Sequence, residues 1–538
     1  MNAVYSRITP TDPGLSQNRA EMEALIARMR RLEARTAARS EARRPIFDKR
    51  GQLSPRDRLA ALLDPGLPFL DLYNMASYLV DDPDPETSVP GASILAGIGF
   101  VAGVRVMVFV DDAGINAGAM TQKSVDKALG VLAIAERQKL PFLHLVESAG
   151  ADLVRYTVEL WAHGGAMFAG LARLSAAGIP VITVLHGAAT AGGAYQPGLS
   201  DYVVGVRGNG MAMLAGAALV QAATGEEATD AALGSAEMHA EVTGLVDYLA
   251  EDDAEALEIA RGLVDSLDWP RAAMARRDYA PPDYPADDIL NVVSADYRRP
   301  YDMGELALRL VDGGSLRAFK PAYGADTLCW QARIMGHAVG LVGNNGPIDP
   351  DGAGKVTHFL QMMDQVGRPV VFLNNTTGYM VGTASERGGM IKAGAKMIQA
   401  VTNLRVPKIA LYVGASFGAG NYGMCGYGFG ADFLFTWPNA RTGVMGGGQA
   451  ALTMEQVARR AAARRGLEVD EARLSAQRQK IIDHFDGQSD AFYTSGRGLD
   501  MGMIDPRDSR RVIGFCIDTC LEARQRRLNP NSFGVARI

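Results

Sequence analysis

Residues Ile179–Pro197 read IPVITVLHGAATAGGAYQP, and residues Val406–Met424 read VPKIALYVGASFGAGNYGM. In each stretch an apolar run passes into a segment of glycine and alanine, which predicts a buried strand followed by a tight turn into a helix. The two stretches align without a gap at an offset of 227 residues (406 − 179), and proline, glycine and tyrosine positions coincide. Chance explains such a repeat poorly, so we predict a duplicated domain.

Strand-like and helix-like segments alternate on both sides of these two stretches. We predict strands at Val104–Asp112, Pro141–Val146, Pro180–Leu185, His337–Gly346, Pro369–Leu373 and Pro407–Val413. We predict helices at Gln17–Ser40, Ser124–Lys139, Gly165–Ala177, Lys355–Val366 and Lys392–Thr402. Lys127 aligns with Lys355 at an offset of 228 residues (355 − 127), so a one-residue insertion separates the two registers. The alternation predicts an α/β fold class with layered sheets and flanking helices.

The chain length predicts more than one domain. The 538 residues exceed the roughly 250–300 residues at which a single hydrophobic core stops growing. A polar stretch at Asp268–Asp302 contains three prolines between residues 281 and 285, and this composition is typical of a linker. We therefore predict two domains, residues 1–290 and residues 291–538.

The composition argues against several classes of protein. Hydrophobic residues make up 48% of the chain, charged residues make up 21%, and the net charge of −6 disfavours a general nucleic-acid-binding protein. The 4 cysteines form no C-x2-C pair and the 7 histidines form no H-x-x-x-H pair, so we predict no metal site. We find no secretory signal and no apolar run of about 18 residues, which predicts a cytoplasmic protein without membrane association. A eukaryotic source would instead indicate the mitochondrial matrix.

The two glycine-rich turns are the best candidates for a chemical role. They are HGAATAGGAY (His186–Tyr195) and GASFGAGNYG (Gly414–Gly423). A strand-to-helix turn without bulky side chains leaves backbone N–H groups directed at open space, and the helix dipole adds positive potential there. Such a turn suits an oxyanion, although small residues could equally serve tight packing of helix on strand. No nucleophile–base pair stands out, which favours chemistry in which a cofactor supplies the base.

A second class of function competes for the same residues. Gly414–Gly418 matches G-x-S-x-G, the pattern of a serine hydrolase, with Ser416 as nucleophile and a histidine such as His484 as base. The equivalent residue of the first half is Ala189, so one of the two repeated turns lacks the hydroxyl group. Gly418–Gly423 also has the spelling G-x-G-x-x-G, but the acidic residue that a dinucleotide site needs about 20 residues later is missing.

Several long motifs resemble the β subunits of biotin-dependent acyl-CoA carboxylases. They are TAGGAY (Thr190–Tyr195), LAGAALVQAATGE (Leu214–Glu226), NTTGYMVG (Asn375–Gly382), SFGAGNYGMCG (Ser416–Gly426) and WPNARTGVMGGGQAA (Trp437–Ala451). The sequences of these motifs are most similar to those of the 3-methylcrotonyl-CoA and geranyl-CoA carboxylase branch. The resemblance implies two tandem crotonase-like domains and the transfer of a carboxyl group from carboxybiotin to an acyl-CoA.

The resemblance also implies how the two turns are used. The backbone amides of Gly192 and Gly193 would hold the thioester oxygen of the acyl-CoA, and those of Gly418 and Ala419 would hold the ureido oxygen of biotin. The substrate-binding positions would be Gly164, Thr190, Ala191, Ala194 and Tyr195, and the biotin-binding positions would be Phe417, Gly420, Asn421 and Tyr422. The acyl-CoA would thus lie on residues 1–290 and biotin on residues 291–538.

The family pattern further implies partners. Biotin would be carried by a separate α subunit that contains the biotin carboxylase and the biotin carrier. The β chains would form a hexamer within an α6β6 holoenzyme, with each active site built from the first domain of one subunit and the second domain of another.

Departures from the family pattern bear on the substrate. The sequence has His163-Gly164-Gly165 where the methylcrotonyl relatives have His-Phe-Gly, and it has Gly447-Gly448-Gln449 where they have Gly-Gly-Glu-Gln. A glycine at residue 164 leaves room for a longer acyl chain than a phenylalanine would. We therefore predict a branched β-methyl enoyl-CoA substrate, geranyl-CoA or 3-methylcrotonyl-CoA. Propionyl-CoA or another acyl-CoA is the alternative.

Overall fold

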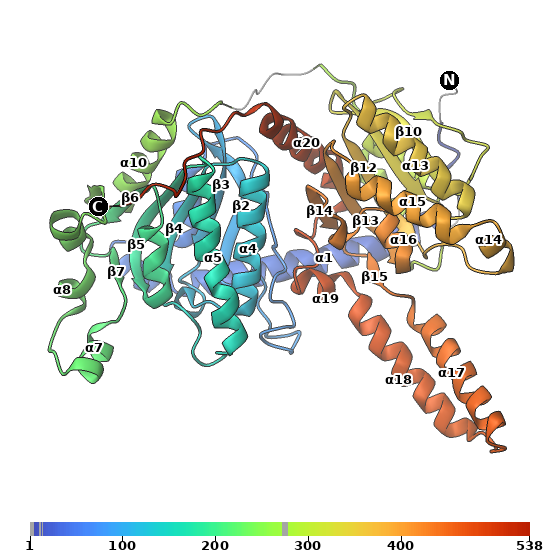
Figure 1. Ribbon diagram of the computed structural model, residues 1–538, viewed down its shortest axis with the longest axis horizontal. Coiled ribbons are helices and arrows are strands. Elements are labelled where there is room, and N and C mark those ends of the chain that lie inside the picture. The colour runs from blue at the N-terminus through green and yellow to red at the C-terminus, as the bar shows by residue number, and fades with distance from the viewer. Residues whose placement is uncertain (1–4, 10–11, 13, 272–277, 538) are drawn as a thin grey trace. The chain divides into compact units, whose positions relative to one another are not determined.

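The computed structural model describes residues 5–9, 12, 14–271 and 278–537. Their contacts divide the chain into two compact units, shown in Figure 1. The first unit contains residues 31–275, 496–498 and 519–538, and the second contains residues 1–30, 276–495 and 499–518. The predicted linker falls partly on residues 272–277, which lie outside the described residues. The division between residues 290 and 291 stays a prediction.

The first unit is built on one mixed sheet. Its strands follow the order β1 (Leu70–Asp71), β2 (Ile94–Val101), β3 (Val104–Asp111), β4 (Phe142–Ser148), β5 (Val181–Thr190), β6 (Tyr202–Val206) and β8 (Tyr248–Ala250), and β7 (Met211–Met213) pairs with the end of β5. Strands β2 and β3 form an antiparallel hairpin, and β3 to β6 run parallel. Every residue of β3 and β4 is buried, as expected for parallel strands covered on both faces.

Helices cover this sheet on its two faces. Its longer helices are α4 (Gln122–Arg137), α5 (Val158–Ala176) and α10 (Asp253–Ser266). The shorter ones are α2 (Arg44–Lys49), α3 (Pro55–Leu62), α6 (Tyr195–Gly198), α7 (Ala217–Thr224), α8 (Asp230–Gly234) and α9 (Ala236–Met238). Helices α4 and α5 pack side by side (Figure 1). Helices α3 and α10 cover the core formed by Val108, Leu145, Val184 and Val204 of four neighbouring strands.

The second unit repeats this plan. Its strand order is β14 (Phe433–Thr436), β13 (Lys408–Phe417), β12 (Val370–Thr376), β11 (His337–Asn344), β10 (Thr327–Ile334) and β9 (Arg317–Ala318), and β15 (Arg441–Gly443) pairs with the end of β13. Its longer helices are α13 (Pro350–Gln365), α15 (Met390–Asn403), α17 (Gly447–Arg464) and α18 (Glu471–Ser489). The shorter ones are α11 (Ile289–Val292), α12 (Met303–Leu310), α14 (Thr383–Arg387) and α16 (Gly418–Gly423). Three more helices, α1 (Leu15–Glu41), α19 (Ala491–Gly496) and α20 (Ser509–Gln525), contain residues of both units.

The strand register shows that the two sheets are equivalent residue by residue. Val146 pairs with Leu185 between β4 and β5, and Asn374 pairs with Tyr412 between β12 and β13. In both sheets the register shifts immediately afterwards, before Ser148 pairs with Ala189 and Thr376 pairs with Ser416. These pairs keep the offsets of 228 and 227 residues found in the sequence. The predicted duplication is therefore present in three dimensions.

The structure extends several predicted elements. Strands β5 and β13 continue beyond their apolar runs to Thr190 and Phe417 because β7 and β15 pair with their ends. Helix α5 begins at Val158, earlier than predicted, because the Thr157 side chain accepts a hydrogen bond from the Leu160 amide and caps the helix. Helices α17 and α18 form a long hairpin that extends away from the second sheet (Figure 1) and was not predicted.

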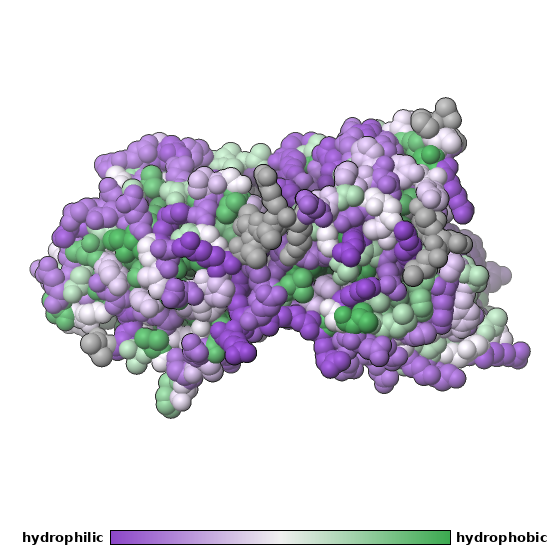
Figure 2. Space-filling view, turned by 90° about the horizontal axis from the view of Figure 1, so that it is seen from above, coloured by the Kyte–Doolittle hydropathy of each residue, from purple (hydrophilic) through white to green (hydrophobic). Residues whose placement is uncertain are grey.

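The face of the molecule shown in Figure 2 is largely hydrophilic, with smaller hydrophobic areas between the polar ones. Among the described residues, helices fall short of the length and apolarity that crossing a membrane requires. The same residues hold no group of three or more histidine, cysteine, aspartate and glutamate side chains that could bind a metal ion.

Candidate active site

The first predicted turn joins β5 to the short 3-10 helix at Ala191–Ala194 and then to α6. Ala191 has a left-handed backbone with φ 53°, which turns the chain sharply as the strand ends. Gly192 is exposed and Gly193 is buried. A Cβ on Gly192 would lie 3.4 Å from the ring of Phe168, so the turn opens beside an aromatic side chain.

The second predicted turn joins β13 to α16. Gly418 takes the left-handed conformation here, with φ 56°, while Ala419 is exposed and Gly420 is buried. A Cβ on Gly420 would lie 2.7 Å from the Cα atom of Gly378, so only glycine fits at this close approach. The left-handed conformation makes Gly418 the counterpart of Ala191, and exposure makes Ala419 the counterpart of Gly192.

The equivalence of the two turns allows their predicted pairs of backbone N–H donors to be compared. The first N–H groups of a helix have no partner within the helix, and in both turns these groups follow directly on the end of a buried strand. Gly192 and Ala419 are the exposed residues at equivalent positions. The donor pairs Gly192–Gly193 and Gly418–Ala419 differ by one position in the repeat, and both pairs stay predictions.

Two tyrosines mark the outer end of the turns. Tyr195 is 51% exposed and its counterpart Tyr422 is 50% exposed. The Tyr195 ring lies 5.9 Å from the ring of Phe168, and the Tyr422 ring lies 5.1 Å from that of Phe429. Both rings are therefore held at the surface beside the turn, where a bound molecule could contact them. Thr190 and Ala194, which were also predicted to contact substrate, are half-buried beside the first turn.

Two of the predicted biotin-binding side chains face the protein interior. Phe417 is 2% exposed, and its ring meets the ring of Tyr297 edge-on at 5.4 Å. Asn421 is 7% exposed, and its Nδ2 atom donates to Ser416 Oγ at 2.8 Å and to the Tyr412 hydroxyl at 3.1 Å. These two side chains support the turn from beneath.

The geometry around Ser416 disfavours a serine hydrolase. Ser416 is 0% exposed, and its Oγ atom donates to Asn374 Oδ1 at 3.1 Å while it accepts the hydrogen bond from Asn421. His484 is an exposed residue of α18, and its hydrogen-bond partner is Gln488 of the same helix. The hydroxyl group thus has neither the access nor the base that a nucleophile needs.

Gly164 lies on α5 and faces open space. A Cβ on this residue would meet no atom within 4 Å. The start of α5 and the loop before it expose several large apolar side chains: Leu153, Val154, Tyr156, Val158 and Trp161. Sequence reasoning did not single out this apolar group: Val154, Val158 and Trp161 have a helical spacing, but α5 begins only at Val158. Together with Gly164 they form a surface suited to an apolar chain.

A cavity of about 670 Å³ lies beside β5 in the first unit. Its lining includes the basic residues Arg43 and Arg50, the acidic residues Glu147 and Asp230, and the small residues Gly187 and Ala188 of β5. Arginine side chains recognise phosphate groups, and glycine permits close approach to the backbone. The cavity therefore has the chemistry to hold a phosphorylated ligand along the strand that leads to the first turn.

A buried ionic network supports this cavity. Arg58 bonds Glu147 at 2.6 Å and Asp253 at 2.9 Å, and His186 Nδ1 lies 2.7 Å from Asp253 Oδ1. Burial and the charge of Arg58 lower the pKa of His186, so the imidazole is neutral and Nδ1–H donates. Burial alone would raise the pKa of Asp253, but His186 and Arg58 lower it to about 2. This network holds β4, β5, α3 and α10 together beneath the cavity.

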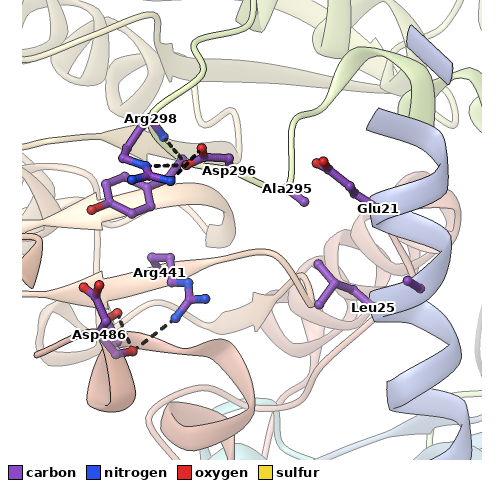
Figure 3. A pocket seen from close by; sticks show the side chains of 10 residues that line it. Glu21, Leu25, Ala295, Asp296, Arg298, Arg441 and Asp486 are labelled. Carbon is purple, nitrogen blue, oxygen red and sulfur yellow. Dashed lines mark hydrogen bonds and ion pairs between the residues drawn. The ribbon is translucent and has the colours of Figure 1, made fainter. Parts of the chain in front are cut away.

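A second cavity, of about 550 Å³, lies within the second unit (Figure 3). Arg441 donates to the backbone carbonyl of Asp486 at 3.1 Å, and Arg298 bonds Asp296 through two nitrogens at 2.9 and 3.0 Å. Tyr297, which packs on Phe417, also lines this cavity. Its lining carries three acidic residues against the two arginines, so the cavity offers no excess of positive charge to an anionic ligand.

Comparison with known proteins assigns the chain to a family. A model of the carboxyl transferase domain matches residues 48–534. The chain belongs to the carboxyl transferase domain family. A probable biotin-dependent acyl-coenzyme A carboxylase beta2 subunit of Mycobacterium tuberculosis is 42% identical over 490 residues, covering 91% of each chain. The mitochondrial methylcrotonoyl-CoA carboxylase beta chain of Arabidopsis thaliana is 37% identical over 537 residues, covering 97% of this carboxyl transferase and 90% of the plant protein.

A solved structure agrees over the full length. The beta subunit of P. aeruginosa geranyl-CoA carboxylase superposes on this carboxyl transferase with a TM-score of 0.93, is 46% identical, and covers 100% of both chains. The predicted fold class is therefore confirmed. The prediction of a carboxyltransferase β subunit of a biotin-dependent acyl-CoA carboxylase, close to the methylcrotonyl-CoA and geranyl-CoA branch, is confirmed as well.

Proposed function

We propose that this carboxyltransferase acts on a long, branched β-methyl enoyl-CoA of the geranyl-CoA type, and on 3-methylcrotonyl-CoA as the shorter relative. The open space at Gly164 carries the proposal, because a phenylalanine there would fill the region that a long acyl chain needs. The exposed apolar side chains before and at the start of α5 support it, since they offer an apolar wall to such a chain. The likeness to the P. aeruginosa geranyl-CoA carboxylase beta subunit points in the same direction.

The first turn would stabilise charge on the acyl-CoA. When the γ-carbon of a β-methyl enoyl-CoA loses a proton, the negative charge spreads through the conjugated double bond to the thioester oxygen. The amides of Gly192 and Gly193 would donate hydrogen bonds to this oxygen. Loss of one such donor typically costs about 10²–10³ in rate, so the turn would supply a large part of catalysis.

The second turn would hold biotin. Carboxybiotin supplies the carboxyl group and, once that group has left, the base for the substrate proton. The half-buried Gly418 and the exposed Ala419 fit a ureido oxygen, because bulky side chains do not cover them. Their amides would orient the ring and share its negative charge. Phe417 and Gly420 would support this turn from inside, and the exposed Tyr422 would contact the ring at its edge.

The cavity beside β5 would bind coenzyme A. Arg43 and Arg50 would pair with its phosphates, and the pantetheine arm would run past Gly187 and Ala188 towards Thr190. This path brings the thioester to the first turn because β5 ends there. A phosphate-directed role for the arginines predicts that affinity for acyl-CoA falls as the salt concentration rises.

We further propose the partners that the family pattern implies. A separate α subunit would carry the biotin carboxylase and the biotinylated carrier, and the β chains would form a hexameric core in an α6β6 holoenzyme. The first half of the chain would bind acyl-CoA and the second half biotin, with each active site shared between two subunits.

The test uses the chain purified together with its α subunit. Carboxylation that depends on ATP and bicarbonate is measured with geranyl-, 3-methylcrotonyl-, propionyl- and acetyl-CoA. We expect geranyl-CoA to give the highest kcat/KM. Gly164→Phe should lower kcat/KM for geranyl-CoA by about 10²-fold while changing that for 3-methylcrotonyl-CoA much less, because only the longer chain reaches the new ring.

Gly165→Phe is the matched control. It adds the same bulk one residue later, about 100° around the helix axis, where space is also open. It should leave the ratio of the two kcat/KM values near that of the wild type. A preference of the wild type for propionyl-CoA would overturn the proposed substrate. Absence of biotin-dependent turnover with all four thioesters would overturn the proposed function.

A further inference from the structure

A cluster of four polar side chains is buried beneath the second turn. Asn421 of α16 donates to Ser416 Oγ at 2.8 Å and to the Tyr412 hydroxyl at 3.1 Å. Ser416 donates to Asn374 Oδ1 at 3.1 Å. The most exposed of the four side chains is Asn421, at 7%. We call these four residues of β12, β13 and α16 the polar cluster.

The polar cluster also binds the backbone that follows the turn. The Asn374 Nδ2 atom donates to the carbonyl of Met424 at 2.9 Å, and the Tyr412 hydroxyl accepts from the Tyr427 amide at 3.0 Å. Burial raises the pKa of Tyr412 to about 12, so its hydroxyl stays protonated across the range in which enzymes of this family would be assayed. The cluster therefore fixes α16 at its middle and just beyond its end.

The first unit fills the equivalent place with apolar side chains. The counterparts of Asn374, Tyr412, Ser416 and Asn421 are Val146, Leu185, Ala189 and Ala194. Three of them, Val146, Leu185 and Ala189, form a small hydrophobic core with Ala212, and Ala194 packs against it. The fold thus accepts a purely apolar core at this position. Folding alone does not require the four polar groups, whose burial is costly unless every one is hydrogen-bonded.

The second turn has less support of its own than the first. It starts with Gly418, whereas the first turn starts with Ala191, and both take the left-handed conformation. Helix α16 holds three glycines in its six residues, and each weakens a helix by about 1 kcal/mol relative to alanine. A glycine-rich turn has many accessible conformations, and nonpolar contacts do not select among them because they lack direction. Hydrogen bonds restrain both distance and angle.

We propose that the polar cluster positions the Gly418 and Ala419 amides towards the ureido oxygen of biotin, with Asn421 as the positioning residue at its centre. This inference rests on the proposed use of the second turn. Asn421 does not touch the bound molecule; it acts by holding α16 against β13. Misplacement of reacting groups by about 1 Å can cost 10²-fold in rate, so modest freedom in the turn has a large effect.

The experiment separates the two turns kinetically. In the reverse direction, the holoenzyme transfers a carboxyl group from carboxylated acyl-CoA to free biotin, and the KM of each reactant is measured separately. Asn421→Ala should lower kcat/KM for biotin by about 10- to 100-fold. The KM for the CoA thioester should stay within about twofold of the wild type, since the first turn is untouched. Unchanged biotin kinetics in this variant would overturn the proposal.

A second variant separates positioning from stability. The combination N374V, Y412L, S416A and N421A installs the apolar core of the first unit in the second. If the cluster served only stability, a well-packed apolar core would restore both the thermal midpoint and the biotin kinetics. We expect the thermal midpoint to recover while kcat/KM for biotin stays low. Recovery of both would contradict the proposal. If this combination does not fold, the single variants Asn421→Ala and Tyr412→Phe test the proposal instead. Each is first shown to fold like the wild type, and its biotin kinetics are then measured.

Val146→Ala in the first unit is the matched control. It weakens the equivalent apolar core and should lower stability by about 1–3 kcal/mol. It should leave the KM for biotin unchanged, so a shift in that KM would show that any loss of stability disturbs the assay and would overturn the interpretation. Wild-type enzyme without transfer to free biotin would instead count against the proposed function of the second turn.

Discussion

The residue with the left-handed backbone conformation differs in type between the two turns. Ala191 and Gly418 both have positive φ, at 53° and 56°. An alanine in this region costs roughly 1–2 kcal/mol through the approach of its Cβ to the backbone, whereas glycine does not meet this cost. The first turn therefore stores strain at the end of β5, and the second turn avoids it at the expense of a more flexible residue.

Substitution of these two residues should change the stability of their units in opposite directions. Ala191→Gly should stabilise the first unit by up to about 1 kcal/mol, because relief of strain exceeds the added chain entropy. Gly418→Ala should destabilise the second by about 1–2 kcal/mol, and its Cβ would lie 3.3 Å from the carbonyl oxygen of Val444. Thermal unfolding of the two variants beside the wild type measures this. Shifts of the same sign would contradict it.

A buried carboxyl group predicts a dependence of stability on pH. Burial raises the pKa of Asp500 to about 7, although bonds from Ser495 and the Gly502 amide oppose the shift. Between the ordinary pKa near 3.8 and this value, the folded chain binds more protons than the unfolded chain. The contribution of Asp500 to stability is therefore greatest at low pH and is lost as pH rises towards 7.

Asp500→Asn removes this titration while it preserves shape. The unfolding free energy of the variant minus that of the wild type should increase by about 1–3 kcal/mol when the pH is raised from about 5 to about 8. Denaturant titrations at both pH values check this expectation. A difference between variant and wild type that does not change with pH would show that Asp500 keeps an ordinary pKa.

Two equivalent helices are each held by a buried lysine. The ammonium of Lys127 on α4 donates to the carbonyls of Tyr73, Gly91 and Ile94 at 2.8–3.4 Å. The ammonium of Lys355 on α13 donates to those of Lys320, Tyr323 and Gly324 at 2.7–3.3 Å. In both units these carbonyls belong to residues that precede or begin the first strand of an antiparallel pair, β2 of β2–β3 and β10 of β10–β11. The sequence showed the aligned lysines, but only the structure shows that each closes such a segment onto its helix.

Replacement of either lysine should therefore destabilise its unit. Lys127→Met leaves three buried carbonyls without their donor and should cost about 2–4 kcal/mol of unfolding free energy. Lys355→Met should cost less, about 1–3 kcal/mol, because water can reach its three part-buried carbonyls. Lys396→Met, at an exposed position of α15, is the control and should change stability by less than about 0.5 kcal/mol. Chemical denaturation of the three variants measures these differences, and equal effects in all three would refute the closing role.

The elements after the two turns differ most between the halves. After β7 the first unit has the short helices α7 and α8, whereas after β15 the second has the α17–α18 hairpin. Sequence periodicity did not reveal this hairpin because its faces contact each other and solvent, so an apolar stripe directed at a core is weak. The termini of α5 and β5 were also missed by several residues, since a threonine cap and a pairing with β7 determine them.

At the scale of the whole molecule, duplication has produced two turns with similar backbones and different surroundings. The first turn lies near a cavity that contains two arginines and beside an apolar core, and the second lies above a polar cluster. Such divergence is consistent with the proposed use of the turns for two different anionic groups, a thioester enolate and a ureido oxygen, which main-chain donors would hold. Subunits that share sites would explain why one chain needs both turns.

Shared sites predict complementation between inactive subunits. Gly192→Val blocks the first turn and Ala419→Val blocks the second, and each variant alone should lose about 10²-fold or more in activity. If a site combines the first half of one chain with the second half of another, co-expression of the two variants should restore up to about a quarter of wild-type activity. Separately purified variants mixed after assembly are the control. Absence of recovery in co-expressed enzyme would place each site within one chain.

The sequence by itself determined the α/β class, the duplication and the location of both turns. Alternation of apolar runs with glycine-rich segments is a local pattern, so it can be recognised without knowledge of tertiary contacts. It could not show that Phe417, Ser416 and Asn421 face inward, since residue type alone does not say which side of a turn becomes buried. Only the tertiary structure decided that, through the packing of α16 on β12 and β13. The same packing decided that one half is supported by apolar side chains and the other by hydrogen bonds.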